Sequence, residues 1–219
     1  MDYLRFVSCA KHFWNNKVKN NCDIYSIHGF HCTQIIYIHI PKTGGLYLCK
    51  SIYGNYGLGH HFYPYYQKVF KKRISKYFVF TVVRNPYNRL ISAINYLNSG
   101  GINNIHKDWK EKYGLEKDIN SFLLKNLEEL VSNDEHFFPQ FKFIEINNAI
   151  PETLDYIGKY EDFNKVKQKI NSIKKIFFPL NKINSSKKYF SVAELSNGSI
   201  KLINRLYHED FINFNYKKR

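Results

Sequence analysis

Residues 35–50, IIYIHIPKTGGLYLCK, decide the fold of this chain. The apolar, mostly β-branched run Ile35–Ile40 predicts a buried strand, and the apolar spacing of Leu46–Ile52 predicts a helix. Between them the turn Pro41–Gly45 contains a proline, which ends a strand, and two glycines, which permit a tight bend. A strand, a glycine turn and a helix leave unpaired N–H groups at the positive end of the helix dipole. This arrangement is typical of a phosphate-binding turn, although an ordinary loop with one exposed lysine has the same local pattern.

A second stretch of the same kind follows. Residues Tyr77–Val83 form another apolar run, and Arg84, Asn85 and Pro86 come directly after it, at the start of a helix predicted to run to about Leu97. Ser92 lies eight residues after Arg84 on that helix, so both side chains can face one bound anion.

These two stretches, PKTGG at 41–45 and VVRNPYNRLISAINY at 82–96, resemble the sulfotransferases that use 3′-phosphoadenosine 5′-phosphosulfate (PAPS). The closest likeness is to the branch with carbohydrate and heparan-sulfate 2-O-sulfotransferases. It continues through HFFPQFKFI at 136–144, DYIGKYEDF at 155–163 and the pattern at 184–216.

The resemblance implies an α/β fold with a mostly parallel sheet flanked by helices, close to that of P-loop nucleotide kinases. Alternating strands and helices predict the same fold class. We expect one domain over residues 1–219, with residues 1–33 as an extension outside the likeness.

The resemblance also implies a set of site residues. The first motif would hold the 5′-phosphosulfate, and the arginine and serine of the second would hold the 3′-phosphate, with a later segment closing over the same phosphates. Carried over by position, these are Lys42, Thr43, Gly44 and Gly45, then Arg84 and Ser92, then Ser185, Ser186, Lys187 and Lys188.

The expected reaction is transfer of a sulfuryl group from PAPS to a hydroxyl, most simply on a carbohydrate, without a metal. Lys42 would stabilise charge on the leaving oxygen. The base is predicted at His60 or His61, which lie between the two phosphate motifs, where the heparan-sulfate 2-O-sulfotransferases keep their catalytic histidine. His136 is the best rival.

The chain departs from the family at one place. Leu46 and Tyr47 follow the glycines, where relatives usually have a threonine or serine that can bond a phosphate oxygen. A family member that binds nucleotide without turnover is therefore an alternative.

Charge and motif order leave two further alternatives. The 219 residues include 33 Lys and Arg against 18 Asp and Glu, a net charge of +15, which favours anionic partners in general. A basic nucleic-acid-binding protein would fit this charge, but no nucleic-acid module is recognisable. A kinase fits less well, because a Walker A motif has its lysine after the glycines.

No apolar run is long enough to span a bilayer, and the first residues do not read as a signal peptide, so the sequence predicts a soluble, cytoplasmic enzyme without a membrane anchor. The four cysteines are expected to be free thiols.

The remaining pattern predicts further elements. Helices are expected over residues 3–14, 118–131, 163–176 and 192–207, and strands over 141–146 and 154–160. Residues 53–70 are expected to form a loop leading into a short helix, and residues 98–113 an exposed loop.

Overall fold

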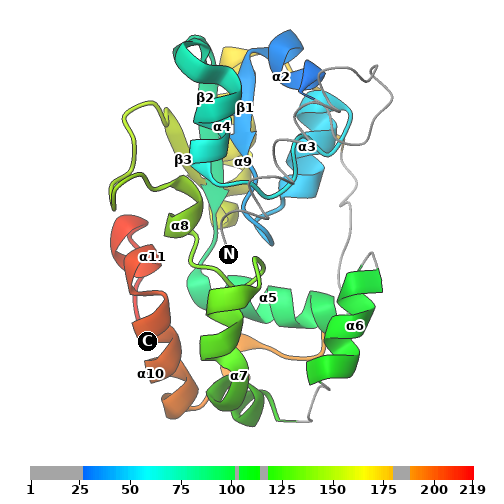
Figure 1. Ribbon diagram of the computed structural model, residues 1–219, viewed down its shortest axis with the longest axis vertical. Coiled ribbons are helices and arrows are strands. Elements are labelled where there is room, and N and C mark those ends of the chain that lie inside the picture. The colour runs from blue at the N-terminus through cyan, green and yellow to red at the C-terminus, as the bar shows by residue number, and fades with distance from the viewer. Residues whose placement is uncertain (1–26, 102–103, 114–117, 180–187) are drawn as a thin grey trace. The chain divides into compact units, whose positions relative to one another are not determined.

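A computed structural model describes residues 27–101, 104–113, 118–179 and 188–219 (Figure 1). By its internal contacts the chain divides into two compact units, which are described one at a time. The first contains the chain up to Ile40, Gly44–Val82 and Phe143–Ile183; the second contains Pro41–Thr43, Val83–Lys142 and Asn184–Arg219.

The first unit is built on a three-stranded sheet with the order β1 (Ile35–Ile38), β2 (Phe78–Val83) and β3 (Tyr156–Lys159). Strands β1 and β2 are parallel, with Ile35 opposite Phe78. Figure 1 shows these strands among the helices of the unit, which are α2 (His28–Thr33), α3 (Gly45–Tyr53), α4 (Tyr63–Phe70), α9 (Phe163–Ile173) and the 3-10 helices η1 (Lys71–Lys76) and η2 (Tyr160–Asp162). The predicted α/β fold with a parallel sheet flanked by helices is confirmed.

The core of the first unit explains why nearly every residue of both strands is apolar. Alternate residues of β1 and β2, Ile35, Tyr37, Phe80 and Val82, pack with apolar side chains of α3 and α9. The intervening residues are buried too, so both faces of the strands are covered, as expected for parallel strands.

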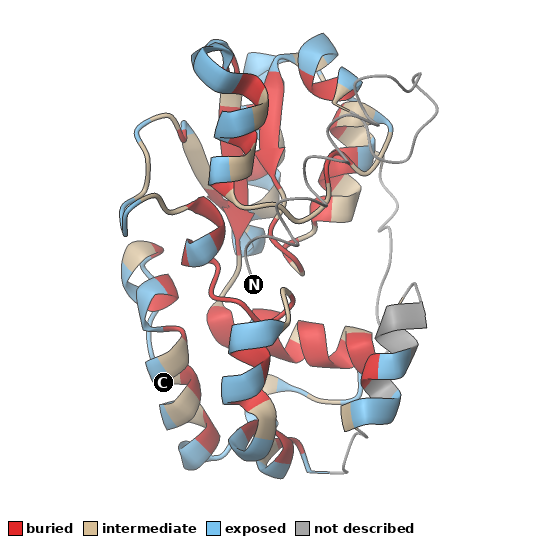
Figure 2. Cartoon of the chain, in the orientation of Figure 1, coloured by how far each residue is buried: buried red, intermediate tan, exposed pale blue. Residues whose placement is uncertain are grey.

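The second unit is helical. Its helices are α5 (Pro86–Asn98), α6 (Asn104–Tyr113), α7 (Ile119–Asn133), α10 (Asn197–Leu206) and α11 (His208–Asn213), with the 3-10 helix η3 (Val192–Glu194); the short α8 (Phe141–Ile144) spans the boundary with the first unit. Figure 2 shows α5 buried along most of its length, and its apolar side chains join those of α7 and α10 in one core.

Several predicted helices are confirmed, namely α3, α5, α7, the short helix α4 after an irregular loop, and α9, which ends three residues before its predicted end. Among the described residues, no helix has both the length and the apolar character needed to cross a membrane. Cys32 and Cys49 are free thiols, as expected. The helix predicted over residues 3–14 lies outside the described residues.

Three expectations are wrong. Residues 98–113 contain the helix α6, which buries Trp109 against Phe122 and Phe137. Residues 141–146 are not a strand, because the buried Asp210 carboxylate accepts the N–H groups at the start of α8 and favours a helical turn there. The helix expected over 192–207 is broken after η3, because the Ser196 side chain caps a new helix, α10.

Candidate active site

The loop that follows β1 is held by two arginines of the second unit. Nε of Arg89 donates to the Pro41 carbonyl at 2.9 Å, and Nη1 of Arg84 donates to the Lys42 carbonyl at 3.2 Å. Lys42 has a φ of 69°, a left-handed conformation that is uncommon for a residue with a side chain. Thr43 is fully buried. The predicted phosphate-loop residues Lys42 and Thr43 are therefore brought together with Arg84.

This loop concentrates positive charge. Burial, and then the charges of Arg84 and Arg89, lower the pKa of Lys42 to about 7. Arg89 is completely buried, and burial lowers its pKa also. One of its terminal nitrogens, Nη2, has no hydrogen-bond partner among the described residues. A group of one buried and two half-buried cations with an unpaired donor fits an anionic ligand with several oxygens.

The backbone of Arg84 is fixed by a buried amide and a buried carboxylate. Gln140 accepts the Arg84 N–H at 2.8 Å and donates to the Arg84 carbonyl at 2.8 Å. Asp210 in turn accepts the backbone N–H groups of Gln140 and Phe141. The chain at the end of β2 is thus paired in the way a further strand would pair it, which fixes where the Arg84 side chain begins.

Ser92, the predicted phosphate-binding serine of the second motif, lies on α5. Ser92 is half-buried and lies one turn before Tyr96, so the two side chains share a face of α5. Nζ of Lys42 lies 3.9 Å from the centre of the Tyr96 ring. The face of α5 that carries Ser92 is therefore the face that meets Lys42.

Lys188 also belongs to this unit. Asn95 Oδ1 accepts the N–H groups of Tyr189 and Phe190, both at 3.0 Å, which ties the chain next to the exposed Lys188 to α5. Ser185, Ser186 and Lys187 lie outside the described residues.

The first unit holds the glycines of the turn and the candidate histidines. His39, at the end of β1, stacks on Tyr37 and contacts His60 edge to face, with ring centres 4.4 Å apart. A Cβ at Gly45 would lie 1.9 Å from the His39 ring, so the ring rests on the first residue of α3. His61 instead packs on Tyr65 of α4, 4.0 Å between ring centres. Of the two predicted histidines, His60 is the one associated with the glycine turn.

His136 lies in the second unit beside a carboxylate. Its Nδ1 is 3.1 Å from Oδ1 of Asp134, and its ring is 5.7 Å from that of Tyr96. The side chain is 7% exposed, so it is packed as well as oriented.

A family model for the sulfotransferase family matches residues 25–217. The chain belongs to the sulfotransferase family. No curated protein and no solved structure matches it. The match begins before Ile35, so the family likeness reaches into α2 and includes both strand–helix junctions.

Tyr47, which stands with Leu46 where relatives usually have threonine or serine, makes its own contacts in the first unit. The Tyr47 hydroxyl donates to the Pro179 carbonyl at 2.7 Å, and its ring packs on Phe163 and Phe178. Tyr47 therefore anchors the chain that leads out of α9. Among the described residues, no group of three or more His, Cys, Asp or Glu side chains is placed to hold a metal ion.

Sequence reasoning missed several residues of this candidate site. Arg89 carries a signal, because it is a charged residue on the otherwise apolar face of α5. His39 also carries one, because it is a polar residue at the end of a buried strand. For Tyr96 and Asp210 the helical pattern offers no signal, since a tyrosine or an aspartate on an amphipathic helix is ordinary.

Proposed function

We propose that this family member transfers a sulfuryl group from PAPS to a hydroxyl of a carbohydrate acceptor. The observation that carries the proposal is the buried loop Pro41–Thr43, where the cations of Lys42, Arg84 and Arg89 meet around two backbone carbonyls. Together with the family match, this charge supports a donor that carries several phosphate and sulfate oxygens.

The donor's sulfated phosphate would lie at the glycine turn. Helix α3 has Gly44 at its N-cap position and no side-chain cap among the described residues, which supports a phosphate as the partner of its first N–H groups. We assign Thr43, Gly44 and Gly45 to this phosphate as backbone donors. Lys42 supplies a cation for the oxygen that leaves sulfur.

The donor's 3′-phosphate would be bound by side chains. Arg84 offers a planar guanidinium, which can bond two phosphate oxygens, and Ser92 offers a hydroxyl from α5. Lys188, held next to α5, supplies a further cation. The assignment of Ser185, Ser186 and Lys187 to the same phosphates rests on the sequence resemblance alone.

His60 is our choice for the base, with His61 and His136 as alternatives. The contact of His60 with His39, which rests on Gly45, favours His60 over His61. His136 has an orienting carboxylate, but its packing between Asp134 and Tyr96 supports a structural role equally well.

In the proposed reaction the acceptor hydroxyl oxygen attacks sulfur, and the bond between sulfur and the phosphate oxygen breaks. His60 takes the hydroxyl proton, and the departing electron pair stays on the phosphate oxygen beside Lys42. The products are a sulfate ester and adenosine 3′,5′-bisphosphate, so atoms and charge balance without a metal or redox partner.

A transfer assay tests this proposal directly. Donor labelled in its sulfuryl group is incubated with a panel of glycans and small alcohols, and label in the acceptor is measured. In parallel, thermal shifts are compared for adenosine 3′,5′-bisphosphate, adenosine monophosphate and an oligonucleotide. Selective stabilisation by the bisphosphate with label transfer supports the proposal; stabilisation by the oligonucleotide alone would favour a nucleic-acid-binding protein.

A second candidate is a family member that binds the nucleotide without turnover. The observation that favours it is the hydrogen bond from Tyr47 to Pro179, because a hydroxyl used there does not replace the missing threonine or serine. This candidate predicts stabilisation by the bisphosphate without any transfer of label.

A further inference from the structure

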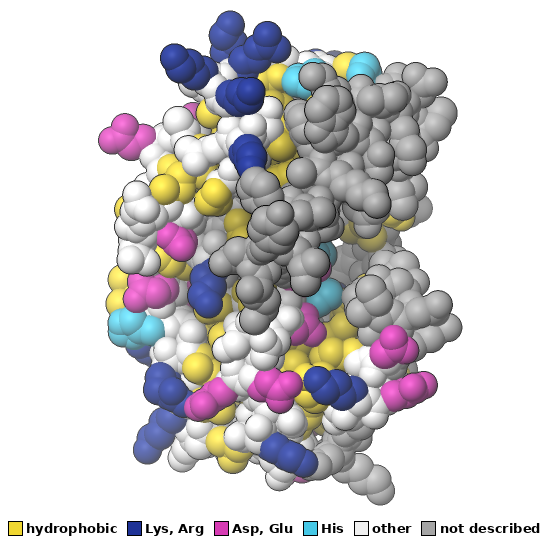
Figure 3. Space-filling view, viewed as in Figure 1, with side chains coloured by type: hydrophobic (Ala, Val, Ile, Leu, Met, Phe, Trp, Pro, Cys, Tyr) yellow, Lys and Arg dark blue, Asp and Glu magenta, His cyan; other side chains and the backbone are white. Residues whose placement is uncertain are grey.

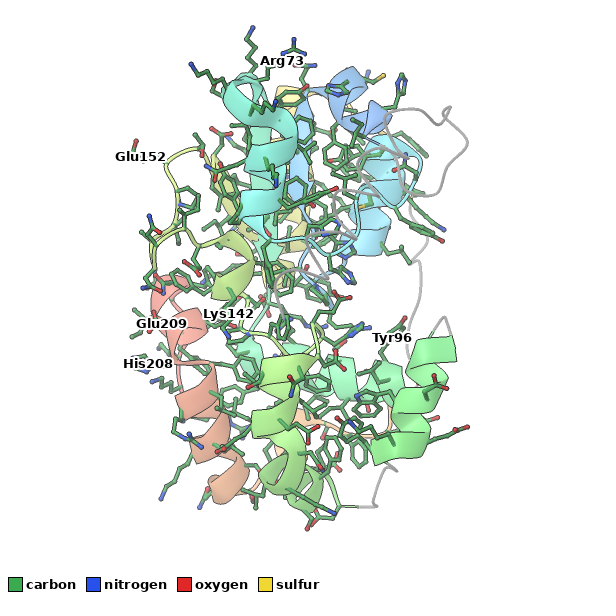
Figure 4. The ribbon with its side chains drawn as sticks, in the orientation of Figure 1. Arg73, Tyr96, Lys142, Glu152, His208 and Glu209 are labelled. Carbon is green, nitrogen blue, oxygen red and sulfur yellow. The ribbon has the colours of Figure 1, made fainter. Side chains whose placement is uncertain are left out.

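The side chain of Tyr96 meets the Lys42 ammonium with the face of its ring. Nζ of Lys42 lies 3.9 Å from the ring centre, well within the range in which a cation is attracted by the negative face of an aromatic ring. Figure 4 marks Tyr96 on α5, and both residues belong to the second unit.

The other charged groups around Lys42 oppose its positive charge. Arg84 contacts the Lys42 carbonyl, and Arg89 contacts the preceding carbonyl, so two guanidinium groups lie close to the loop. Lys42 forms no ion pair with a carboxylate of the described residues. Burial and these two arginines lower its pKa to about 7, so near neutral pH the ammonium is readily lost.

The Tyr96 ring also packs against a histidine of the same unit. His136 packs against it with the ring planes 30° apart, and Asp134 fixes His136 through both its ring nitrogen and its backbone N–H. Asp134 ends α7, whereas Tyr96 lies on α5, so two helices contribute to the support. The Asp134 carboxylate therefore supports the ring through His136.

We infer that Tyr96 is a positioning residue, whose ring face keeps Lys42 protonated and directed in the cation-rich loop, with His136 and Asp134 holding the ring. The inference rests on the proposed function in one respect, namely that Lys42 acts on the leaving oxygen. Its physical content, a ring that stabilises a half-buried lysine ammonium, can be measured without any turnover.

The first test measures the titration of Lys42 itself. Lysines are dimethylated with ¹³C, and the Lys42 signal is identified by its absence in Lys42→Met. We expect Tyr96→Leu to lower the pKa of Lys42 by about one pH unit and Tyr96→Phe to leave it near the wild-type value, since a phenyl ring keeps the negative face. The matched control is Tyr113→Leu, which removes a half-buried ring 4.7 Å from Nζ of Lys112.

A second variant series guards against loss of folding. Phenylalanines with increasing fluorine content, placed at residue 96, keep the shape of the ring while weakening its negative face. The pKa of Lys42 should fall stepwise along this series. An unchanged titration across the series, or Tyr96→Phe behaving like Tyr96→Leu in a folded protein, would overturn the inference.

Kinetics connect the ring to the reaction. The ratio kcat/KM for the donor, measured against pH, reports groups of the free enzyme. Tyr96→Leu should reduce this ratio about tenfold at pH 7.5 and much less near pH 6, where Lys42 is protonated again. If the Lys42 titration shifts as expected but no enzyme form transfers sulfate, the inference about Tyr96 holds and the proposed function fails. If transfer occurs and Tyr96→Leu changes neither titration nor pH profile, the reverse is true.

Discussion

The two strand–helix junctions of this sulfotransferase begin their helices in different ways. Helix α3 starts at Gly44, which has a φ of 83° and no side-chain cap. Helix α5 starts at Asn85, whose side chain accepts the N–H groups of Tyr87 and Asn88, with Pro86 at the first helical position. Among the described residues, no side chain caps the first N–H groups of α3, whereas the Asn85 side chain satisfies those of α5.

This difference predicts how each junction recognises an anion. At the first, backbone N–H groups and the helix dipole are available, and Lys42 adds one cation. At the second, recognition must come from side chains, Arg84 and Ser92, because the backbone donors are occupied. The net positive charge of the protein does not distinguish the two junctions, because many of the cations lie elsewhere. Figure 3 shows lysines and arginines gathered over α4 and η1, where the exposed ones are Lys68, Lys71, Lys72, Arg73 and Lys76.

The largest expected effect is at the first junction, at the histidine associated with the glycine turn. His60→Ala should reduce turnover by about 10²–10⁴, as for a lost general base, while adenosine 3′,5′-bisphosphate still binds. His61→Ala is the matched control and should have a much smaller effect, because His61 packs on Tyr65. Turnover against pH is the measurement. Full activity in both variants and in the double variant would move the base to His136.

Lys42→Ala should reduce turnover by about 10²–10³ with a much smaller change in donor affinity, because its charge matters most when the leaving oxygen develops charge. Single-turnover rates and equilibrium binding separate the two effects. Lys50→Ala, which removes an exposed lysine of α3, should leave the rate unchanged. A wild-type rate in Lys42→Ala would exclude Lys42 from the chemistry.

Lys42 should also make the stability of the fold depend on pH. Its pKa is about 7 in the fold and 10.5 in the unfolded chain, so the unfolded state binds more protons between these values. The free energy of unfolding is therefore highest, as far as Lys42 is concerned, above pH 10.5. It decreases as pH falls toward 7, because the folded state lacks the proton that the unfolded state binds. Lys42→Met should raise the free energy of unfolding by about 2–4 kcal/mol at pH 6, with the gain shrinking toward pH 10. Denaturant titrations at several pH values measure this; a gain that does not change with pH would contradict it.

Arg84→Ala tests the side-chain recognition expected at the second junction. Loss of charge-assisted hydrogen bonds should weaken binding of the 3′-phosphorylated donor by about 1.5–3 kcal/mol, while binding of adenosine 5′-phosphosulfate stays nearly unchanged. Ser92→Ala should lower the same preference less. If Arg84→Ala discriminates the two nucleotides as well as wild type, the 3′-phosphate is bound elsewhere.

The sequence predicted both junctions because their signals are local. A buried strand followed by Pro41–Gly45, or by Arg84–Pro86, specifies a turn and a helix start within a few residues. The family resemblance added the roles of Lys42 and Arg84, and the structure brings these two residues together.

Long-range contacts could not be predicted in this way. The helical turn at Phe141 depends on Asp210, which follows about seventy residues later, and the orientation of Arg84 depends on Gln140, which is 56 residues away. Apolar alternation at 141–146 predicts a strand, because the period of a sequence does not show a distant carboxylate that bonds the backbone.

The smallest expected effect separates capping from ligand binding at the two helix starts. Asn85→Ala removes the cap of α5 and should lower the free energy of unfolding by about 1 kcal/mol, with little change in donor affinity, because those N–H groups bond the asparagine and not the ligand. The comparison is Gly44→Ala at the start of α3. There the positive φ strains any side chain, and the new Cβ would lie 3.0 Å from the Phe163 ring, so stability also falls. The two variants should differ in nucleotide binding. After allowance for stability, Gly44→Ala should weaken binding and Asn85→Ala should not. Calorimetry with adenosine 3′,5′-bisphosphate measures this at a temperature where both variants are folded. Equal losses of affinity would mean that the N–H groups of α3 do not bind the donor and that both anion sites are built from side chains.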